Sequence, residues 1–88
     1  MTRAVIVSGA RTPVGKFGGA FRDHSASELG AAAIKAALER ANVDPGMVED
    51  VFMGTALQAS ENGYSSRLSA LKAGIPDEVP AIAINRQC

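Results

Sequence analysis

Cys88 is the only cysteine in the chain, and it is the residue best suited to nucleophilic chemistry. It follows the apolar run 81–84 and the tripeptide 85–87. In parallel α/β sheets, active sites lie just beyond the carboxyl ends of the strands, where loops and helix N-termini converge. If residues 81–84 belong to a strand of such a sheet, Cys88 is placed at this edge. The spacing therefore makes Cys88 the candidate nucleophile, although a lone buried cysteine often acts only as a small hydrophobic residue.

Other groups that could take part in chemistry have weaker patterns. Arg11, Lys16 and Arg22 could meet an anionic ligand, but isolated loop charges are more often solvated or paired. His24 is the only histidine, and it precedes the first predicted helix in a segment that matches no catalytic motif, so a solvated loop histidine is favoured. Arg86 could lower the pKa of the nearby thiol, yet strand alternation could equally point it away. We assign Arg86 no role.

Three glycines in the same loop suggest a phosphate-binding turn at first sight. Gly15, Gly18 and Gly19 lack the spacing of a dinucleotide-binding loop, and no Lys-Ser or Lys-Thr pair follows them. Structural turns and subunit contacts are the favoured interpretation.

Composition limits the class of protein. The chain has 88 residues, 47% of them hydrophobic, and its nine basic residues balance its nine acidic residues. A neutral chain without basic clusters argues against nucleic acid or an anionic membrane as the main partner. One cysteine makes no internal disulfide, and the sequence has neither a zinc-ligand pattern nor a signal or membrane-spanning segment. We expect a cytoplasmic protein with no metal site.

The elements alternate between strand and helix. Apolar runs and turn residues predict strands over 4–7, 48–53 and 79–85, the first of them buried on both faces. Helices are predicted from the capping box at 25–28 to about 42, and over 64–73 before Gly74 and Pro76. A β-loop-α-β-loop-α-β order implies right-handed crossovers and a mainly parallel sheet of the α/β class.

Helical periodicity predicts which faces are buried. In the first helix the small residues Ala26, Gly30, Ala33, Ala37 and Ala41 fall on one side, which would let the helix lie close to a sheet.

In the second helix, Leu68 and Leu71 are expected to point inward, with Arg67 and Lys72 outward. The last strand is wholly apolar and needs a further covering helix. We therefore expect residues 1–88 to form a single incomplete domain.

Three segments in order resemble the thiolases, the acetyl-CoA acyltransferases. Segment 7–19 (VSGARTPVGKFGG) looks like the N-terminal signature of that family, and segment 67–80 is similar to the region before its nucleophile. Segment 84–88 (INRQC) matches the first half of the active-site motif. The resemblance identifies the chain as the N-terminal part of the thiolase N-terminal domain.

The resemblance implies that Cys88 takes an acyl group from a coenzyme A thioester and passes it to a second acyl-CoA carbanion or to free coenzyme A. Coenzyme A is then substrate and product, and no cofactor is bound covalently. The family's histidine base and second cysteine belong to its C-terminal half, so this chain needs the C-terminal remainder as its partner and is expected to be inactive alone. The family also implies a homodimer or homotetramer.

Two alternatives remain open at this stage. A decarboxylating condensing enzyme of the same superfamily shares the cysteine, although loop 11–17 (RTPVGKF) favours a thiolase. A noncatalytic fragment could instead use an exposed sheet edge as an interaction surface.

Overall fold

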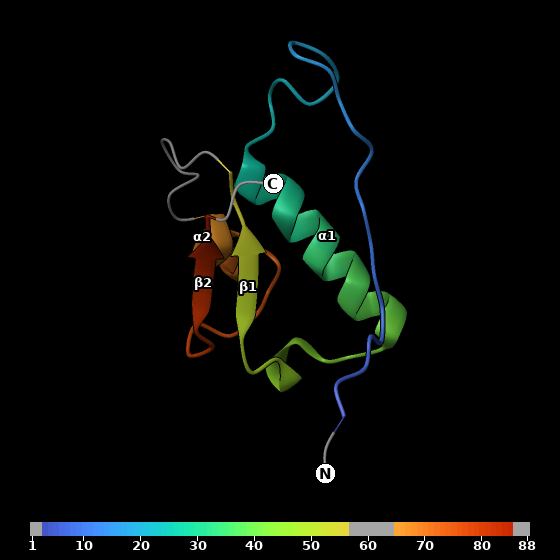
Figure 1. The fold of residues 1–88 in the computed structure, drawn as a ribbon, viewed down its shortest axis with the longest axis vertical. Helices are drawn as coiled ribbons and strands as arrows, with labels where there is room; N and C mark the ends of the chain where they lie inside the picture. The colour runs from blue at the N-terminus through green and yellow to red at the C-terminus, as the bar shows by residue number, and fades with distance from the viewer. Residues whose placement is uncertain (1–2, 57–64, 86–88) are drawn as a thin grey trace.

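The computed structural model describes residues 3–56 and 65–85, and these form a small α/β unit (Figure 1). The elements in chain order are α1 (Ala26–Ala41), the 3-10 turn η1 (Pro45–Met47), β1 (Val51–Gly54), α2 (Ser65–Lys72) and β2 (Ala81–Ile84). The predicted α/β class is confirmed. Residue 64, expected to begin the second helix, and residues 86–88 lie outside the described residues.

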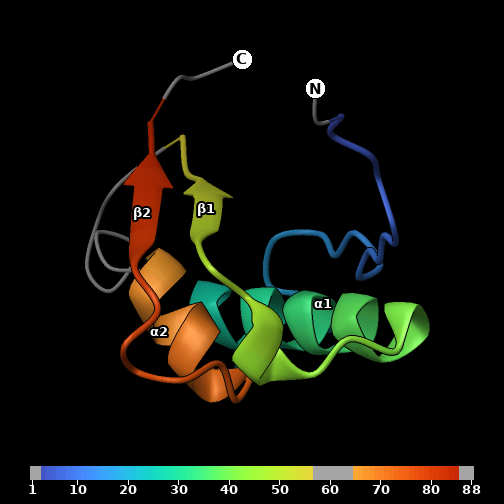
Figure 2. The same ribbon diagram turned by 90° about the horizontal axis from the view of Figure 1, so that it is seen from below.

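The sheet is parallel, as predicted. Val51 of β1 lies opposite Ala81 of β2, and Gly54 lies opposite Ile84, so the two strands start and end together. Between them the chain passes through α2, which lies behind the strands in Figure 1. Figure 2 shows α1 and α2 next to each other, and the two helices are in contact. Two connected parallel strands thus bring their carboxyl ends to one edge.

Helix α1 starts and stops at the predicted residues. The Ser25 hydroxyl accepts a hydrogen bond from the backbone N–H of Glu28 at 3.2 Å, which satisfies one of the donors that a helix start leaves free. At the other end Asn42 adopts the left-handed conformation with φ 56°, a position that asparagine tolerates better than most residues. Local signals are therefore sufficient to set this helix.

The buried face of α1 differs from the predicted one. Ala26 is exposed, while Ser27 and Ala31 are buried and Ile34 and Leu38 pack against the core. The reason is that α1 packs on α2 as well as lying near the strands, so the buried stripe is rotated by about one residue.

Gly30 lies where α1 packs closely against Ser69 of α2 and Met53 of β1. A Cβ atom there would be 2.5 Å from Oγ of Ser69 and 3.1 Å from Cε of Met53. A glycine at this position therefore lets α1 pack closely on α2 and β1.

Helix α2 buries small and polar residues rather than leucines. Leu71 is 42% exposed, so its predicted inward direction is wrong. The residues of α2 that are buried are Ser65, Ser66, Ser69 and Ala70. A small face lets α2 contact both α1 and the sheet closely, whereas a leucine side chain would hold the layers apart.

Arg67, which was expected to point outward, is half-buried. Its guanidinium donates to the carbonyl oxygens of Asp77 at 2.7 Å and Val79 at 3.0 Å. These bonds fix the turn between α2 and β2. Gly74, with φ +91°, ends α2 as predicted.

The core lies between α2, the strands and the turn before β2. It consists of Val51, Ala70, Ile75 and Val79, with Ile34, Leu38, Val48 and Ala81 packed around it. All these side chains belong to α1 or to residues after it.

The expected first strand over 4–7 is not formed. Val5, Ile6 and Val7 are 74%, 96% and 68% exposed, and this segment runs past α1 without joining the sheet (Figure 1). A strand buried on both faces needs neighbouring strands and two covering layers, and the sheet of the described residues has two strands. The other two strands are shorter than predicted: β1 covers Val51–Gly54 where 48–53 was expected, and β2 covers Ala81–Ile84 where 79–85 was expected.

Candidate functional site at the carboxyl edge of the sheet

The proposed nucleophile, Cys88, lies outside the described residues, as does Arg86. The described chain reaches Asn85, which follows the last residue of β2 and precedes Cys88 by three positions. Three residues of extended chain span at most about 11 Å. Covalent geometry alone therefore limits how far the thiol is from the carboxyl edge of the sheet.

Polar side chains from three elements meet at this edge. The backbone N–H of Thr55 donates to the carbonyl oxygen of Ile84 at 2.9 Å, which extends the ladder one residue beyond β1. The Thr55 hydroxyl lies 3.0 Å from the hydroxyl of Ser65, a buried residue at the start of α2. Thr55 thus joins the end of β1 to both β2 and α2.

Asn85 completes the arrangement. With its amide oriented to satisfy its neighbours, Nδ2 donates to the carbonyl oxygens of Thr55 and Ala56, each at 3.2 Å. We call Thr55, Ser65 and Asn85 the strand-end cluster. It ties the residue that follows β2 to the residues that follow β1, and so fixes where the chain leaves the sheet toward Cys88.

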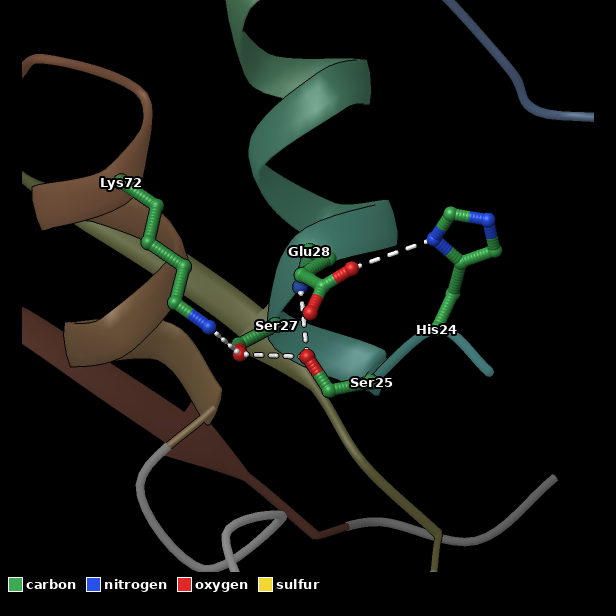
Figure 3. Close-up of polar contacts among 5 residues, drawn as sticks. All are labelled: His24, Ser25, Ser27, Glu28 and Lys72. Carbon is green, nitrogen blue, oxygen red and sulfur yellow. Dashed lines mark hydrogen bonds and ion pairs between the residues drawn. The ribbon is translucent and has the colours of Figure 1, made fainter. Parts of the chain in front are cut away.

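A second polar group lies at the start of α1 (Figure 3). Nζ of Lys72 donates to Oγ of Ser27 at 2.7 Å, and Oγ of Ser27 lies 3.1 Å from Oγ of Ser25. Lys72 was expected to point outward, but its ammonium reaches across to α1.

A paired lysine can activate a serine for attack in some hydrolases. Here Ser27 has no exposed surface, and so no substrate carbonyl can reach it. Oγ of Ser69 also donates to the carbonyl oxygen of Ser27 at 3.1 Å. The arrangement therefore fastens α1 to α2.

His24 belongs to this second group and not to the strand-end cluster. Its Nδ1 lies 3.1 Å from a carboxylate oxygen of Glu28, its side chain is half exposed, and its ring meets that of Phe21 edge-on. This placement agrees with a loop histidine that supports the helix start.

The glycine loop forms a tight turn. Gly18 has φ +71°, and the N–H of Gly19 donates to the carbonyl oxygen of Lys16 at 2.9 Å. Of the loop cations, Arg11 and Lys16 are exposed, and Arg22 is 3.7 Å from Asp23 in an exposed pair. The predicted structural turn is present, and these cations do not converge on a common point in the described contacts.

Within residues 3–56 and 65–85, no three His, Cys, Asp or Glu side chains gather where they could hold a metal ion. No helix in this described part of the chain has the length and apolar content to cross a membrane.

Comparison with known proteins decides the family. Residues 4–88 match the sequence profile described as "Thiolase, N-terminal domain". The chain belongs to the thiolase family. The thiolase match includes segment 84–88, and therefore Asn85 and Cys88.

Curated relatives agree with this assignment. The chain is 54% identical over 88 residues to a "Probable acetyl-CoA acetyltransferase" of Mycobacterium tuberculosis and to an "Acetyl-CoA acetyltransferase" of Cupriavidus necator. It is 40% identical over the same length to a "Probable acetyl-CoA acyltransferase" of Staphylococcus epidermidis. All of this chain is covered in each case, and it spans 22% of the length of each relative.

Sequence reasoning missed the strand-end cluster. Asn85 is predicted only as part of the motif segment 84–88, and the sequence patterns give Thr55 no role. The available signal was positional: a polar residue follows β1 at Thr55 and β2 at Asn85, and the ends of adjacent parallel strands meet.

Proposed function

We propose that residues 1–88 are the N-terminal part of a thiolase N-terminal domain and supply the nucleophile, Cys88, for acyl transfer between coenzyme A thioesters. The observation that carries the proposal is the thiolase match over residues 4–88, which takes in the motif segment 84–88. The parallel strands β1 and β2 support it, since they end at the same edge of the sheet and β2 ends four positions before Cys88.

The reaction follows from thiol chemistry. The Cys88 thiolate forms a carbon–sulfur bond with the acyl carbonyl carbon, and the bond from that carbon to the coenzyme A sulfur breaks. The electron pair leaves with the coenzyme A thiolate, which takes up a proton. Because one thioester is exchanged for another, the free energies of reactant and acyl-enzyme are nearly equal, and the acyl-enzyme stays reactive.

The acyl group then leaves Cys88 in one of two ways. A carbanion, formed by loss of an α-proton from a second acyl-CoA, attacks the carbonyl carbon and expels the Cys88 thiolate, which makes a 3-ketoacyl-CoA. In the thiolytic direction, the Cys88 thiolate attacks the 3-keto carbon of a 3-ketoacyl-CoA, the C2–C3 bond breaks, and the carbanion of the shortened fragment takes up a proton and leaves as acetyl-CoA. A coenzyme A thiolate then attacks the carbonyl carbon of acyl-Cys88 and expels the cysteine thiolate. Acetyl-CoA is the proposed donor, because relatives at 54% identity are named acetyl-CoA acetyltransferases.

The rest of the active site is proposed to come from a C-terminal remainder. The resemblance assigns the histidine base and a second cysteine to that remainder, and His24 is occupied with Glu28 at the start of α1. We therefore propose that the 88-residue chain is inactive alone, that the assembled protein is a cytoplasmic homodimer or homotetramer, and that it uses coenzyme A without a covalently bound cofactor.

A noncatalytic interaction role is the second candidate. The favouring observation is the outer face of the sheet, where Phe52 and Ile82 lie opposite each other and are 66% and 50% exposed. This role predicts binding through that face without any acyl transfer to Cys88.

A full-length chimera separates the two candidates. Residues 1–88 replace the matching segment of the Cupriavidus necator acetyl-CoA acetyltransferase, and release of coenzyme A from acetoacetyl-CoA synthesis is followed. We expect turnover by the chimera and none by the Cys88→Ser variant or by residues 1–88 alone. A folded chimera in which Cys88→Ser turns over at the unmodified rate would refute the nucleophile, and turnover by residues 1–88 alone would refute the need for a remainder.

A further inference from the structure

We propose that Asn85 is a positioning residue, whose side-chain amide fixes the point at which the chain leaves β2, three positions before Cys88. This inference rests on the proposed role of Cys88 as the nucleophile. It goes beyond that role, because it assigns a function to a side chain that need not touch the substrate.

The geometry supports a clamp. Asn85 is the first residue after β2, and with its amide oriented so that Nδ2 faces these acceptors, Nδ2 donates to two successive carbonyl oxygens, those of Thr55 and Ala56. Two bonds from one amide restrain both the side chain and the backbone that carries it. The clamp therefore acts at the point where the sheet ladder no longer holds the chain.

The partner of the clamp is itself fixed. Thr55 receives its position from the N–H bond to Ile84 and from the hydroxyl contact with Ser65, which is only 3% exposed. A restraint is useful only if its anchor does not move, and here the anchor is joined to β2 and α2. Asn85, the last described residue before Cys88, is thus held to the ends of β1 and β2.

The chemistry explains why the residue is an amide. Two carbonyl oxygens need a donor with two hydrogens, which the asparagine amide supplies. Aspartate would place a negative charge against the same two oxygens, and alanine would leave them without this donor. Misplacing a reacting group by about 1 Å can cost a rate factor of about 100.

The test uses the full-length chimera and the single-turnover acetylation of Cys88 by acetyl-CoA. We expect Asn85→Ala to lower the acetylation rate constant at saturating acetyl-CoA by about tenfold, with less than about a twofold change in the half-saturating concentration. Asn85→Gln keeps the two donors on a longer side chain, and we expect it to restore at least about a third of the rate. The restoration separates the clamp from a general loss of structure.

Asn42→Ala is the matched control. It removes the same side chain from the far end of α1, and we expect acetylation at the unmodified rate despite lower stability. An Asn85→Ala rate within about twofold of the unmodified chimera, or an Asn85→Gln rate no higher than that of Asn85→Ala, would overturn the positioning role. Failure of the unmodified chimera to acetylate Cys88 would instead overturn the proposed function.

Discussion

Residues 25–85 and residues 3–24 differ in how far their apolar side chains are buried. In the described part of the first region, Val51, Ile75 and Val79 are buried where two helices meet a sheet. In the second region, the valines and the isoleucine of segment 4–7 are exposed to solvent, and Phe17 is fully exposed in a turn. The difference teaches that the β1-α2-β2 unit with α1 buries one face of its sheet by itself, although Phe52 and Ile82 on the other face stay exposed. Segment 4–7 buries none of its apolar side chains, because it needs surfaces that residues 3–56 and 65–85 do not provide.

The same substitution, valine to alanine, made once in each region tests this comparison with the largest expected effect. Val51→Ala removes two methyl groups from the core and should lower the free energy of unfolding by about 2 kcal/mol. Val5→Ala in the exposed segment should change the free energy of unfolding by less than about 0.5 kcal/mol. Urea unfolding of the 88-residue chain, followed by circular dichroism, gives both values. Equal losses would mean that segment 4–7 is packed in solution.

The next largest loss of unfolding free energy is expected at the contact between α1 and α2. An alanine at residue 30 favours the helix, but its Cβ would overlap Oγ of Ser69, and overpacking costs about 1 to 3 kcal/mol. We expect Gly30→Ala to lower the free energy of unfolding by about 1.5 kcal/mol. In a Ser69→Ala background the same change should cost about 1 kcal/mol less, since the overlapping oxygen is gone. Additive losses in a double-mutant cycle would show that the two helices do not meet at these residues.

The smallest effect concerns the end of α1. Asn42 has a positive φ, where alanine is disfavoured, so Asn42→Ala should cost about 1 kcal/mol. Asn42→Gly removes that steric conflict and should be at least about 0.5 kcal/mol more stable than Asn42→Ala. Both variants are compared by thermal unfolding. If the Asn42→Ala variant were as stable as the Asn42→Gly variant, residue 42 would not have the left-handed backbone conformation at the end of α1.

Local sequence signals predicted the parts of the fold that local physics decides. The Ser25 cap, the end of α1 at Asn42 and the end of α2 at Gly74 each depend on a few neighbouring atoms. The parallel pairing of β1 and β2 followed from their alternation with a helix.

Tertiary packing determines which side chains are buried and which apolar runs form strands, and local sequence patterns do not predict this. Periodicity ranks Leu71 above Ser69 for burial, yet close contact with α1 buries Ser69 and leaves Leu71 exposed. An apolar run such as 4–7 does not reveal whether its neighbours are present. The strand-end cluster depends on which residues follow two strands far apart in sequence, and Cys88 as the nucleophile stays a prediction from the motif.

Direct detection of an acyl-cysteine tests the central claim. The full-length chimera is mixed briefly with acetyl-CoA, quenched in acid and digested, and the peptide that contains Cys88 is examined by mass spectrometry. The account predicts one acetyl group on Cys88, which disappears when coenzyme A is added before the quench. An unmodified Cys88 peptide from a chimera that is turning over acetyl-CoA would contradict it.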